Sequence, residues 1–205
     1  MLALTDRRNR NTTAPMALRL VRPELRCMPL VLVAALLSPL CGCGSGLEAL
    51  FPPLDTVANV DVNRYTGKWY EIARYPNWFQ SSCASSTAEY TANADSTIGV
   101  FNTCLAGDGS VNSTIQGTAR VVDSTTNAKL KVLFPGIPFA GDYWIIQLGE
   151  NYEYAVVGEP TRTNLFILSR TPTLDQAVLD AILRRLPDQG YDPARLVYDT
   201  PVTGQ

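Results

Sequence analysis

The sequence of 205 residues contains no histidine. This absence excludes a histidine general base, metal sites built from imidazole and haem held by histidine. Basic residues are also few after residue 42. The sequence has 17 basic and 19 acidic residues, of which six basic and two acidic residues lie in residues 1–42. The rest of the chain therefore has 11 basic and 17 acidic residues and a net charge of about −6. A negative domain repels nucleic acid and anionic lipid, so we expect it to bind neither.

Long apolar runs are scarce as well. The run at residues 28–40 has about thirteen residues and follows a basic stretch at 19–26. It is too short to cross a bilayer but has the length of the apolar part of a signal peptide. Residues 1–42 are therefore predicted to be removed rather than folded. The basic region is unusually long, and the sequence leaves open whether translation begins at Met1 or at Met16.

The apolar run ends in Leu40-Cys41-Gly42-Cys43. This order resembles a bacterial lipobox, in which a leucine stands three residues before the cysteine and a small residue directly before it. The resemblance implies that Cys43 becomes an acylated N-terminus. The other frame, cleavage before Cys41, would place Pro39 and Leu40 at the cleavage side. An ordinary secretory signal with two incidental cysteines is the remaining alternative.

Residues 43–60 are small and polar, with Pro52-Pro53 in the middle. This composition is typical of a tether, here between a lipid anchor and a folded domain. Gly44, rather than an aspartate, follows the candidate lipid cysteine. By resemblance to the known sorting signal, this favours the outer membrane of a Gram-negative bacterium, with the domain facing the periplasm.

From Lys68 onward, short apolar and aromatic runs recur between clusters of Gly, Asn, Asp and Pro, and helical periodicity is absent for about a hundred residues. This spacing is typical of an antiparallel barrel or sandwich. Eight strands in succession favour an all-β, up-and-down barrel that is wide enough for one small ligand. The predicted strands are 68–75, 84–93, 98–105, 112–122, 128–134, 142–149, 152–159 and 163–170.

One amphipathic helix is predicted after the eighth strand. Thr173 and Gln176 are spaced as a capping box, and the apolar residues of 174–186 share one helical face. Pro187 to Gly190 is expected to end the helix. The apolar face must pack against the outside of the barrel, and residues 195–199 are predicted to form a short final strand.

Three segments resemble a known family. Residues 63–76 read Asn-Arg-Tyr-Thr-Gly-Lys-Trp-Tyr-Glu-Ile-Ala-Arg-Tyr-Pro and resemble the first conserved block of the lipocalins, most closely of the bacterial outer-membrane lipocalins and apolipoprotein D. Residues 151–156 and 165–172 resemble the second and third blocks. The resemblance covers about residues 60–200 and implies a lipocalin domain at 61–205 with a ligand-binding calyx.

The resemblance also implies roles for three residues. Gly67 lets the chain bend between one turn of helix and the first strand. In the lipocalins the arginine of the third block packs over the tryptophan of the first block. Here that cation–π pair would be Arg170 on Trp69, at the closed end of the barrel.

Cys83 and Cys104 lie at matching ends of the second and third predicted strands. In an oxidising periplasm such a pair is expected to form a disulfide. A reactive thiol is the weaker interpretation, because neither cysteine has a histidine to activate it.

Strand alternation, anchored on the three blocks, predicts which side chains line the barrel interior. An inward carboxylate is costly unless it is paired, so Glu71 should pair with an arginine or meet a polar group of a ligand. The other residues are mostly apolar and aromatic, which suits an elongated hydrophobic molecule, although the same residues could also fill the barrel. The predicted lining is Glu71, Ala73, Ala88, Tyr90, Asn102, Phe134, Tyr143 and Phe166.

These observations predict a lipid-binding outer-membrane lipoprotein, not an enzyme, that uses no cofactor or metal. By resemblance, its ligands would be fatty acids, lysophospholipids or similar molecules. The apolar loop 134–139, near the open end, is expected to contact membrane or to guide ligand entry. The alternatives are an enzyme on the same scaffold or a structural envelope protein. The sequence leaves a homodimer open.

Overall fold

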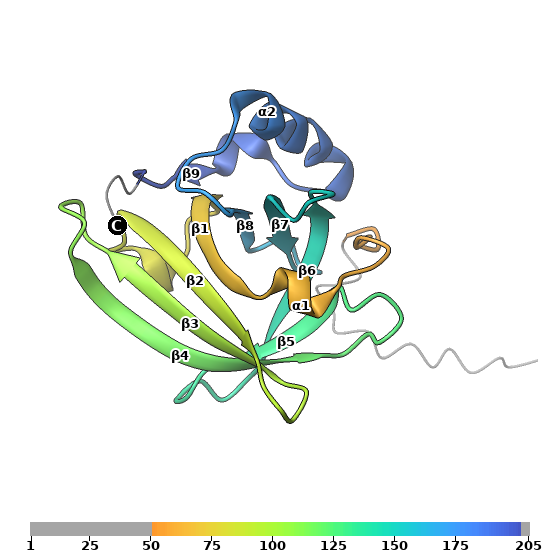
Figure 1. Cartoon of the computed structure of the whole chain (residues 1–205). Helices are drawn as coiled ribbons and strands as arrows, with labels where there is room; N and C mark the ends of the chain where they lie inside the picture. The colour runs from red at the N-terminus through yellow and green to blue at the C-terminus, as the bar shows by residue number, and fades with distance from the viewer. Residues whose placement is uncertain (1–50, 202–205) are drawn as a thin grey trace, which may run out of the picture. The chain divides into compact units, whose positions relative to one another are not determined.

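The computed structural model describes residues 51–201, so the predicted signal peptide and Cys43 lie outside the described residues. The described chain forms one closed antiparallel barrel in which consecutive strands pair and β8 also pairs with β1 (Figure 1). Each of the eight predicted strands is present within two residues of its predicted bounds. The strands are β1 (Gly67–Arg74), β2 (Ser85–Ala92), β3 (Ile98–Leu105), β4 (Val111–Val121), β5 (Lys129–Leu133), β6 (Gly141–Leu148), β7 (Tyr154–Gly158) and β8 (Leu165–Ser169).

The chain enters the barrel through a single helical turn, α1 (Val62–Tyr65). The carboxylate of Asp61 caps it by accepting from the backbone N–H groups of Asn63 and Arg64 at 2.9 and 3.4 Å. Gly67 follows with φ +91°, a conformation that residues with a side chain rarely adopt. The predicted glycine bend between helix and strand is therefore confirmed.

The two ends of the barrel differ. Because neighbouring strands are antiparallel, the connections after β1, β3, β5 and β7 share one end, and those after β2, β4 and β6 share the other. Helix α1 covers the second end: the Asp61 N–H donates to the Tyr152 hydroxyl at 2.8 Å, and the Val60 N–H donates to the Thr126 carbonyl at 2.7 Å. We call this the closed end, and the other the open end.

Two apolar clusters lie on opposite sides of the sheet. One fills the barrel interior around Trp69, and the second lies between the barrel and helix α2 (Gln176–Arg185) around Ile182. Helix α2 therefore packs against the outside of the barrel, as predicted (Figure 1). Strand β9 (Val197–Tyr198) then pairs with β1. Within the part of the chain that is described, no helix has the length and apolarity to cross a membrane.

The start of α2 differs from the prediction. Asp175, not Thr173, is the N-cap, and its carboxylate accepts from the N–H groups of Ala177 and Val178 at 2.8 and 3.4 Å. A carboxylate also interacts favourably with the positive end of the helix dipole, which a threonine hydroxyl does not. The predicted stop is confirmed, because a 3₁₀ turn at Pro187–Gln189 leads to Gly190 with φ +81°.

Residues 51–60, which the sequence assigned to a tether, run from near the open end to the closed end, with Leu54 in the cluster under α2 and Val60 in the interior cluster. Near the open end, the Arg162 guanidinium in the β7–β8 connection donates to the Pro52 carbonyl at 2.7 Å. The Val57 N–H donates to the Ile145 carbonyl at 3.0 Å, and Val60 reaches the closed end. The described chain therefore begins beside the open end.

Candidate functional site

The closed end is sealed by Arg170. Its guanidinium lies 3.8 Å from the centroid of the Trp69 ring, which is the contact that the resemblance implied. The same group donates to three backbone carbonyls of residues 64–68 at 2.7–3.2 Å and to the Tyr152 carbonyl at 3.3 Å. Trp69 has no exposed surface, and its Nε1 donates to the Tyr65 carbonyl at 2.8 Å. No ligand can pass this end without breaking those bonds.

Three tyrosine hydroxyls form a chain inside the barrel above this seal. The Tyr143 hydroxyl lies 2.7 Å from that of Tyr65 and 3.0 Å from that of Tyr90. Burial raises the pKa of Tyr90 to about 12 and the pKa values of Tyr65 and Tyr143 well above the usual range. The hydroxyls are therefore neutral donors and acceptors. Tyr90 and Tyr143 were predicted to line the interior, whereas Tyr65 was missed because α1 was assigned only to a turn.

Toward the open end, the interior is accessible to solvent. Ala88, Asn102 and Ile115 are neighbours across β2, β3 and β4, so their side chains share the interior face with Trp69. Ile115 is nevertheless 42% exposed. The reason is that β4 pairs with β5 only from Thr118 onward, so its first half has β3 on one side alone. The open half of the barrel is a cup with a gap in its wall.

Asn102 carries an unsatisfied polar atom in this cup. Its side-chain oxygen Oδ1 is buried and has no hydrogen-bond partner among the described residues. A buried acceptor without a partner costs about 1–3 kcal/mol. The Asn102 side chain lies on the interior face between Ala88 and Ile115, so a donor that reaches Oδ1 would come from a molecule inside the cup.

Phe134 stands at the edge of the gap. A Cβ on Gly117 would lie only 2.6 Å from Cδ1 of the Phe134 ring, so the absence of a side chain at Gly117 lets this ring approach β4. A surface hollow of about 470 Å³ lies beside it, lined by residues 116–118 and 133–137. The apolar loop 134–139 thus borders the gap at the open end, as the sequence predicted for its position.

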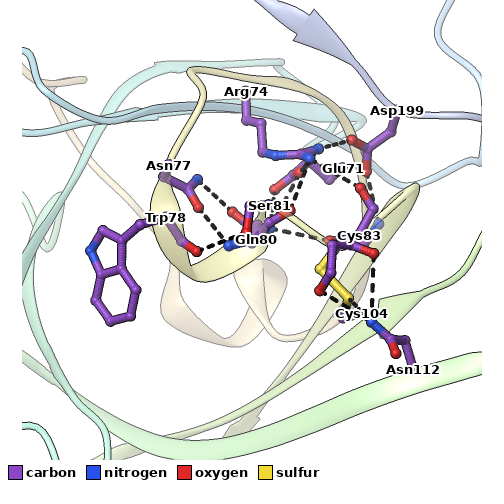
Figure 2. The surroundings of a disulfide bond; sticks show 12 residues. Glu71, Arg74, Asn77, Trp78, Gln80, Ser81, Cys83, Cys104, Asn112 and Asp199 are labelled. Atoms are coloured by element: carbon purple, nitrogen blue, oxygen red, sulfur yellow. Dashed lines mark hydrogen bonds and ion pairs between the residues drawn. A yellow bond between two sulfur atoms is a disulfide. The ribbon is translucent and has the colours of Figure 1, made fainter.

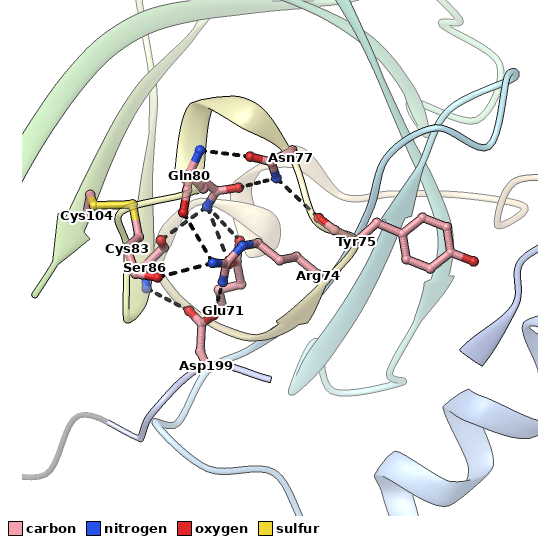
Figure 3. A network of polar contacts seen from close by, with 9 residues as sticks. All are labelled: Glu71, Arg74, Tyr75, Asn77, Gln80, Cys83, Ser86, Cys104 and Asp199. Atoms are coloured by element: carbon pink, nitrogen blue, oxygen red, sulfur yellow. Dashed lines mark hydrogen bonds and ion pairs between the residues drawn. A yellow bond between two sulfur atoms is a disulfide. The ribbon is translucent and has the colours of Figure 1, made fainter. Parts of the chain in front are cut away.

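A polar network crosses the cup near its rim (Figure 3). Arg74 Nη1 donates to Glu71 Oε1 at 3.0 Å and also to Asp199 Oδ1. Gln80 Nε2 donates to both Glu71 oxygens at 3.1 and 3.3 Å, and the Ser86 N–H donates to Asp199 Oδ2 at 2.7 Å. Glu71 therefore pairs with an arginine, which was one of the two roles predicted for it.

The network contains two buried carboxylates and one cation. Burial, and then the charge of Asp199, raises the pKa of Glu71 to about 8. Burial also raises the pKa of Asp199. At neutral pH the pair can therefore hold a proton. Arg74 and Asp199 are 125 residues apart in the sequence, and no local pattern predicted that they meet.

The predicted inward position of Ala73 is wrong. The register between β1 and β8 shifts at Ile72, so that Ala73 is opposite Ile167 and packs in the cluster under α2. This β-bulge reverses the alternation after Glu71 and turns Arg74 inward, opposite Phe166. The remaining predicted lining residues lie on the interior face, namely Glu71, Ala88, Tyr90, Asn102, Phe134, Tyr143 and Phe166.

The predicted disulfide between Cys83 and Cys104 is confirmed (Figure 2). Their Cα atoms are 5.2 Å apart, and the bond ties the β1–β2 connection to the end of β3. Arg74 Nη2 donates to the Cys83 carbonyl at 3.2 Å, so the disulfide and the polar network support the same part of the rim. For a loop of this length the cross-link contributes about 3 kcal/mol in the chain-entropy model.

Comparison with known proteins agrees with this geometry. The family model described as a lipocalin-like domain matches residues 60–201. The outer membrane lipoprotein Blc of Vibrio cholerae is 36% identical over 175 residues, which cover 85% of this chain and 98% of that protein. Bovine apolipoprotein D is 34% identical over 161 residues, covering 72% of this chain and 82% of that protein. Insecticyanin from the tobacco hornworm Manduca sexta shares the fold, with a TM-score of 0.61, 18% identity, and coverage of 74% of this chain and 86% of that chain.

Proposed function

The chain belongs to the lipocalin family, and from this premise we propose that it binds one lipophilic molecule in its calyx and sequesters or carries it in the cell envelope. Fatty acids and lysophospholipids are the proposed ligands. The similar proteins named as outer membrane lipoproteins support attachment to that membrane, here through an acylated Cys43. The proposed ligand contacts are Glu71, Ala88, Tyr90, Asn102, Phe134, Tyr143 and Phe166.

The observation that carries this proposal is the buried Oδ1 of Asn102, which has no partner among the described residues. In a barrel that binds no ligand, this unpaired oxygen would lower the stability of the fold without serving any function. A ligand with a donor group, such as the hydroxyl of a lysophospholipid or a protonated carboxyl, would satisfy it. The exposed, inward Ile115 supports a cup that admits such a molecule.

We propose binding rather than catalysis. General acid and base chemistry requires groups whose pKa values are separated and that face a substrate. Glu71 is instead bonded to Arg74 and Gln80, and the tyrosine hydroxyls are bonded to one another. Cys83 and Cys104 are joined, so neither offers a thiolate.

The test of the calyx compares one substitution on each face of the barrel. Phe166→Asp places a third carboxylate inside, opposite Arg74, which Glu71 and Asp199 already share, so its charge is not fully compensated. We expect it to weaken the affinity for lysophosphatidylcholine and palmitic acid by at least about tenfold. Phe101→Asp is the matched control, because Phe101 is 37% exposed and points outward from β3. Native mass spectrometry of delipidated protein would measure both affinities, beside thermal unfolding.

If folded Phe166→Asp protein binds both lipids as tightly as the Phe101→Asp control, the calyx is not the binding site. The alternative hypothesis, a structural envelope protein with a filled barrel, would then be favoured. Asn102→Leu adds a separate check on the polar contact. It should weaken binding of a lysolipid with a free hydroxyl more than binding of the same lipid with that hydroxyl methylated.

Membrane attachment has its own test. Replacing Cys43 by Ser removes the proposed acylation site, so we expect the protein to move from the membrane fraction to the soluble fraction. Cys41→Ser is the control and should stay membrane-bound. Fractionation followed by mass spectrometry of the N-terminal peptide would measure both. Release by Cys41→Ser instead would show that the cleavage frame is the other one.

A further inference from the structure

The open end of the barrel presents large aromatic side chains to solvent. Trp78 and Phe79, in the 3₁₀ turn η2 (Trp78–Gln80) of the β1–β2 connection, are 81% and 53% exposed. Phe139, in the β5–β6 connection, is 71% exposed. We call these three residues the aromatic rim. Trp78 and Phe79 are in contact, with ring centroids 5.6 Å apart, and Phe139 lies on another connection of the same end. Exposed large apolar side chains at one end of a protein that has an ample core mark an interaction surface.

The rim is held in place rather than left loose. The Asn77 side chain caps η2 by accepting from the Gln80 N–H at 2.9 Å, and the Ser81 hydroxyl donates to the Trp78 carbonyl at 3.1 Å. The disulfide at Cys83 fixes the following residues. Figure 2 shows the Trp78 indole turned away from these bonded side chains. The chain therefore holds the backbone of this turn firmly while the ring faces outward.

Charge divides the two ends of the barrel sharply. The three open-end connections at 75–84, 106–110 and 134–140 contain one charged residue, Asp108. The fourth contains Glu159 and Arg162, which are both buried. The closed-end connections, by contrast, contain Asp95, Asp123, Glu150 and Glu153, and the cations Arg64 and Arg170 lie at the same end. Asp192 and Arg195 of the C-terminal segment also lie near the open end, where they contact Tyr75, and they carry opposite charges. Apolar connections with so little net charge suit a neutral lipid surface, whereas the acidic connections of the closed end would be repelled by an anionic one.

The position of the N-terminus points to the same surface. The described chain begins beside the open end, where the Arg162 guanidinium lies 5.4 Å from the centroid of the Phe51 ring and bonds the Pro52 carbonyl. Seven residues lie between Cys43 and Phe51, so the eight Cα–Cα steps span at most about 27 Å when extended. An anchor at Cys43, as in the proposed function, is therefore attached on the side of the open end and allows that end to lie against the membrane.

We propose that the aromatic rim docks on the zwitterionic lipid surface of the membrane, with the mouth of the calyx against the bilayer. Tryptophan and phenylalanine favour the boundary between headgroups and acyl chains. In this orientation the gap between β4 and β5 and the loop 134–139 also face the lipid. A ligand then enters or leaves the calyx directly from the bilayer, without crossing water.

The experiment uses Cys43→Ser protein, so that binding through an acyl chain is absent, and vesicles of phosphatidylcholine and phosphatidylethanolamine. Replacing Trp78, Phe79 and Phe139 together by serine should lower partition into these vesicles by at least about tenfold. Val122→Ser is the control, because Val122 is 57% exposed in a closed-end turn, and it should not change partition. Raising the salt concentration from 0.1 to 0.5 M should not weaken binding, because the rim is nearly uncharged.

Unchanged partition of the triple variant, an equal loss in Val122→Ser, or binding to anionic vesicles alone would each overturn the proposal. Self-association that depends on the rim, without vesicle binding, would also overturn it and would assign the rim to a second copy of the chain. The triple variant should keep its solution affinity for lysophosphatidylcholine. Loss of rim docking is thereby distinguished from failure of the calyx proposal, which the Phe166→Asp variant tests.

Discussion

Replacing Trp69 by alanine is expected to lower the free energy of unfolding by about 3–5 kcal/mol, the usual cost of removing a large buried aromatic side chain. The indole has no exposed surface, supports the Arg170 guanidinium at 3.8 Å and donates to the Tyr65 carbonyl. Its removal would leave a cavity under the closed end. Urea unfolding followed by circular dichroism would measure the loss.

Trp78→Ala is the matched control, because this tryptophan is 81% exposed and should change stability by no more than about 0.5 kcal/mol. Lipid affinity of the Trp69→Ala protein should fall only as its folded fraction falls. Equal losses of stability in the two variants, or a loss of affinity in fully folded Trp69→Ala protein, would contradict the structural role given to Trp69.

Replacing Arg74 by methionine is expected to destabilise the fold by about 3–5 kcal/mol at pH 9, because the change removes the cation shared by two buried carboxylates. Glu71 and Asp199 would then face one another without their shared partner. Strand β9 would also lose its side-chain link to β1. The loss should be smaller at pH 5, where the Glu71 carboxyl is protonated and needs no cation.

The sign of this pH dependence follows from Glu71. Its pKa is raised to about 8 in the folded protein from 4.5, so between these values the folded state holds a proton that the unfolded state has released. The contribution of this group to stability is therefore present at low pH and is lost as the pH rises from about 4.5 to 8. Glu71→Gln is the control and should flatten this slope. Urea unfolding at pH 5, 7 and 9 would measure it, and an Arg74→Met deficit that does not change with pH would contradict the argument.

Much of the site could be predicted because it depends on local regularities. Period-2 alternation along each strand fixed the inward positions of Ala88, Tyr90 and Asn102, since a strand with one face in the core cannot slip by one residue without reversing every side chain. The Arg170–Trp69 contact followed from the blocks that carry both residues, and the strand ends placed Cys83 near Cys104. The strand and cysteine inferences need only the sequence near the residue and the order of the strands, whereas the Arg170–Trp69 contact rested on the resemblance to the lipocalins.

The predictions were wrong where residues distant in the sequence determine the local structure. The bulge at Ile72 turned Ala73 outward, toward the cluster that α2 covers, and turned Arg74 inward. Alternation cannot foresee it, because a bulge changes the register without changing the apolar character of the strand. The cap of α2 was placed at Thr173 because the spacing allowed it, yet the carboxylate of Asp175 competes better for the same N–H groups.

The sequence by itself determined the closed barrel, the helix outside it and the disulfide, because these follow from side-chain period, turn residues and cysteine position. The sealed end followed from the resemblance of the blocks that carry Trp69 and Arg170 to those of the lipocalins. Only the tertiary structure decided how the open end is built. The exposure of Ile115 depends on the position at which β4 stops pairing with β5. The unsatisfied Asn102 oxygen depends on the side chains that surround it. The bond between Arg74 and Asp199 joins two segments that are 125 residues apart in the sequence. Such features depend on the relative positions of whole strands, and the free energy that fixes those positions is shared over the entire core.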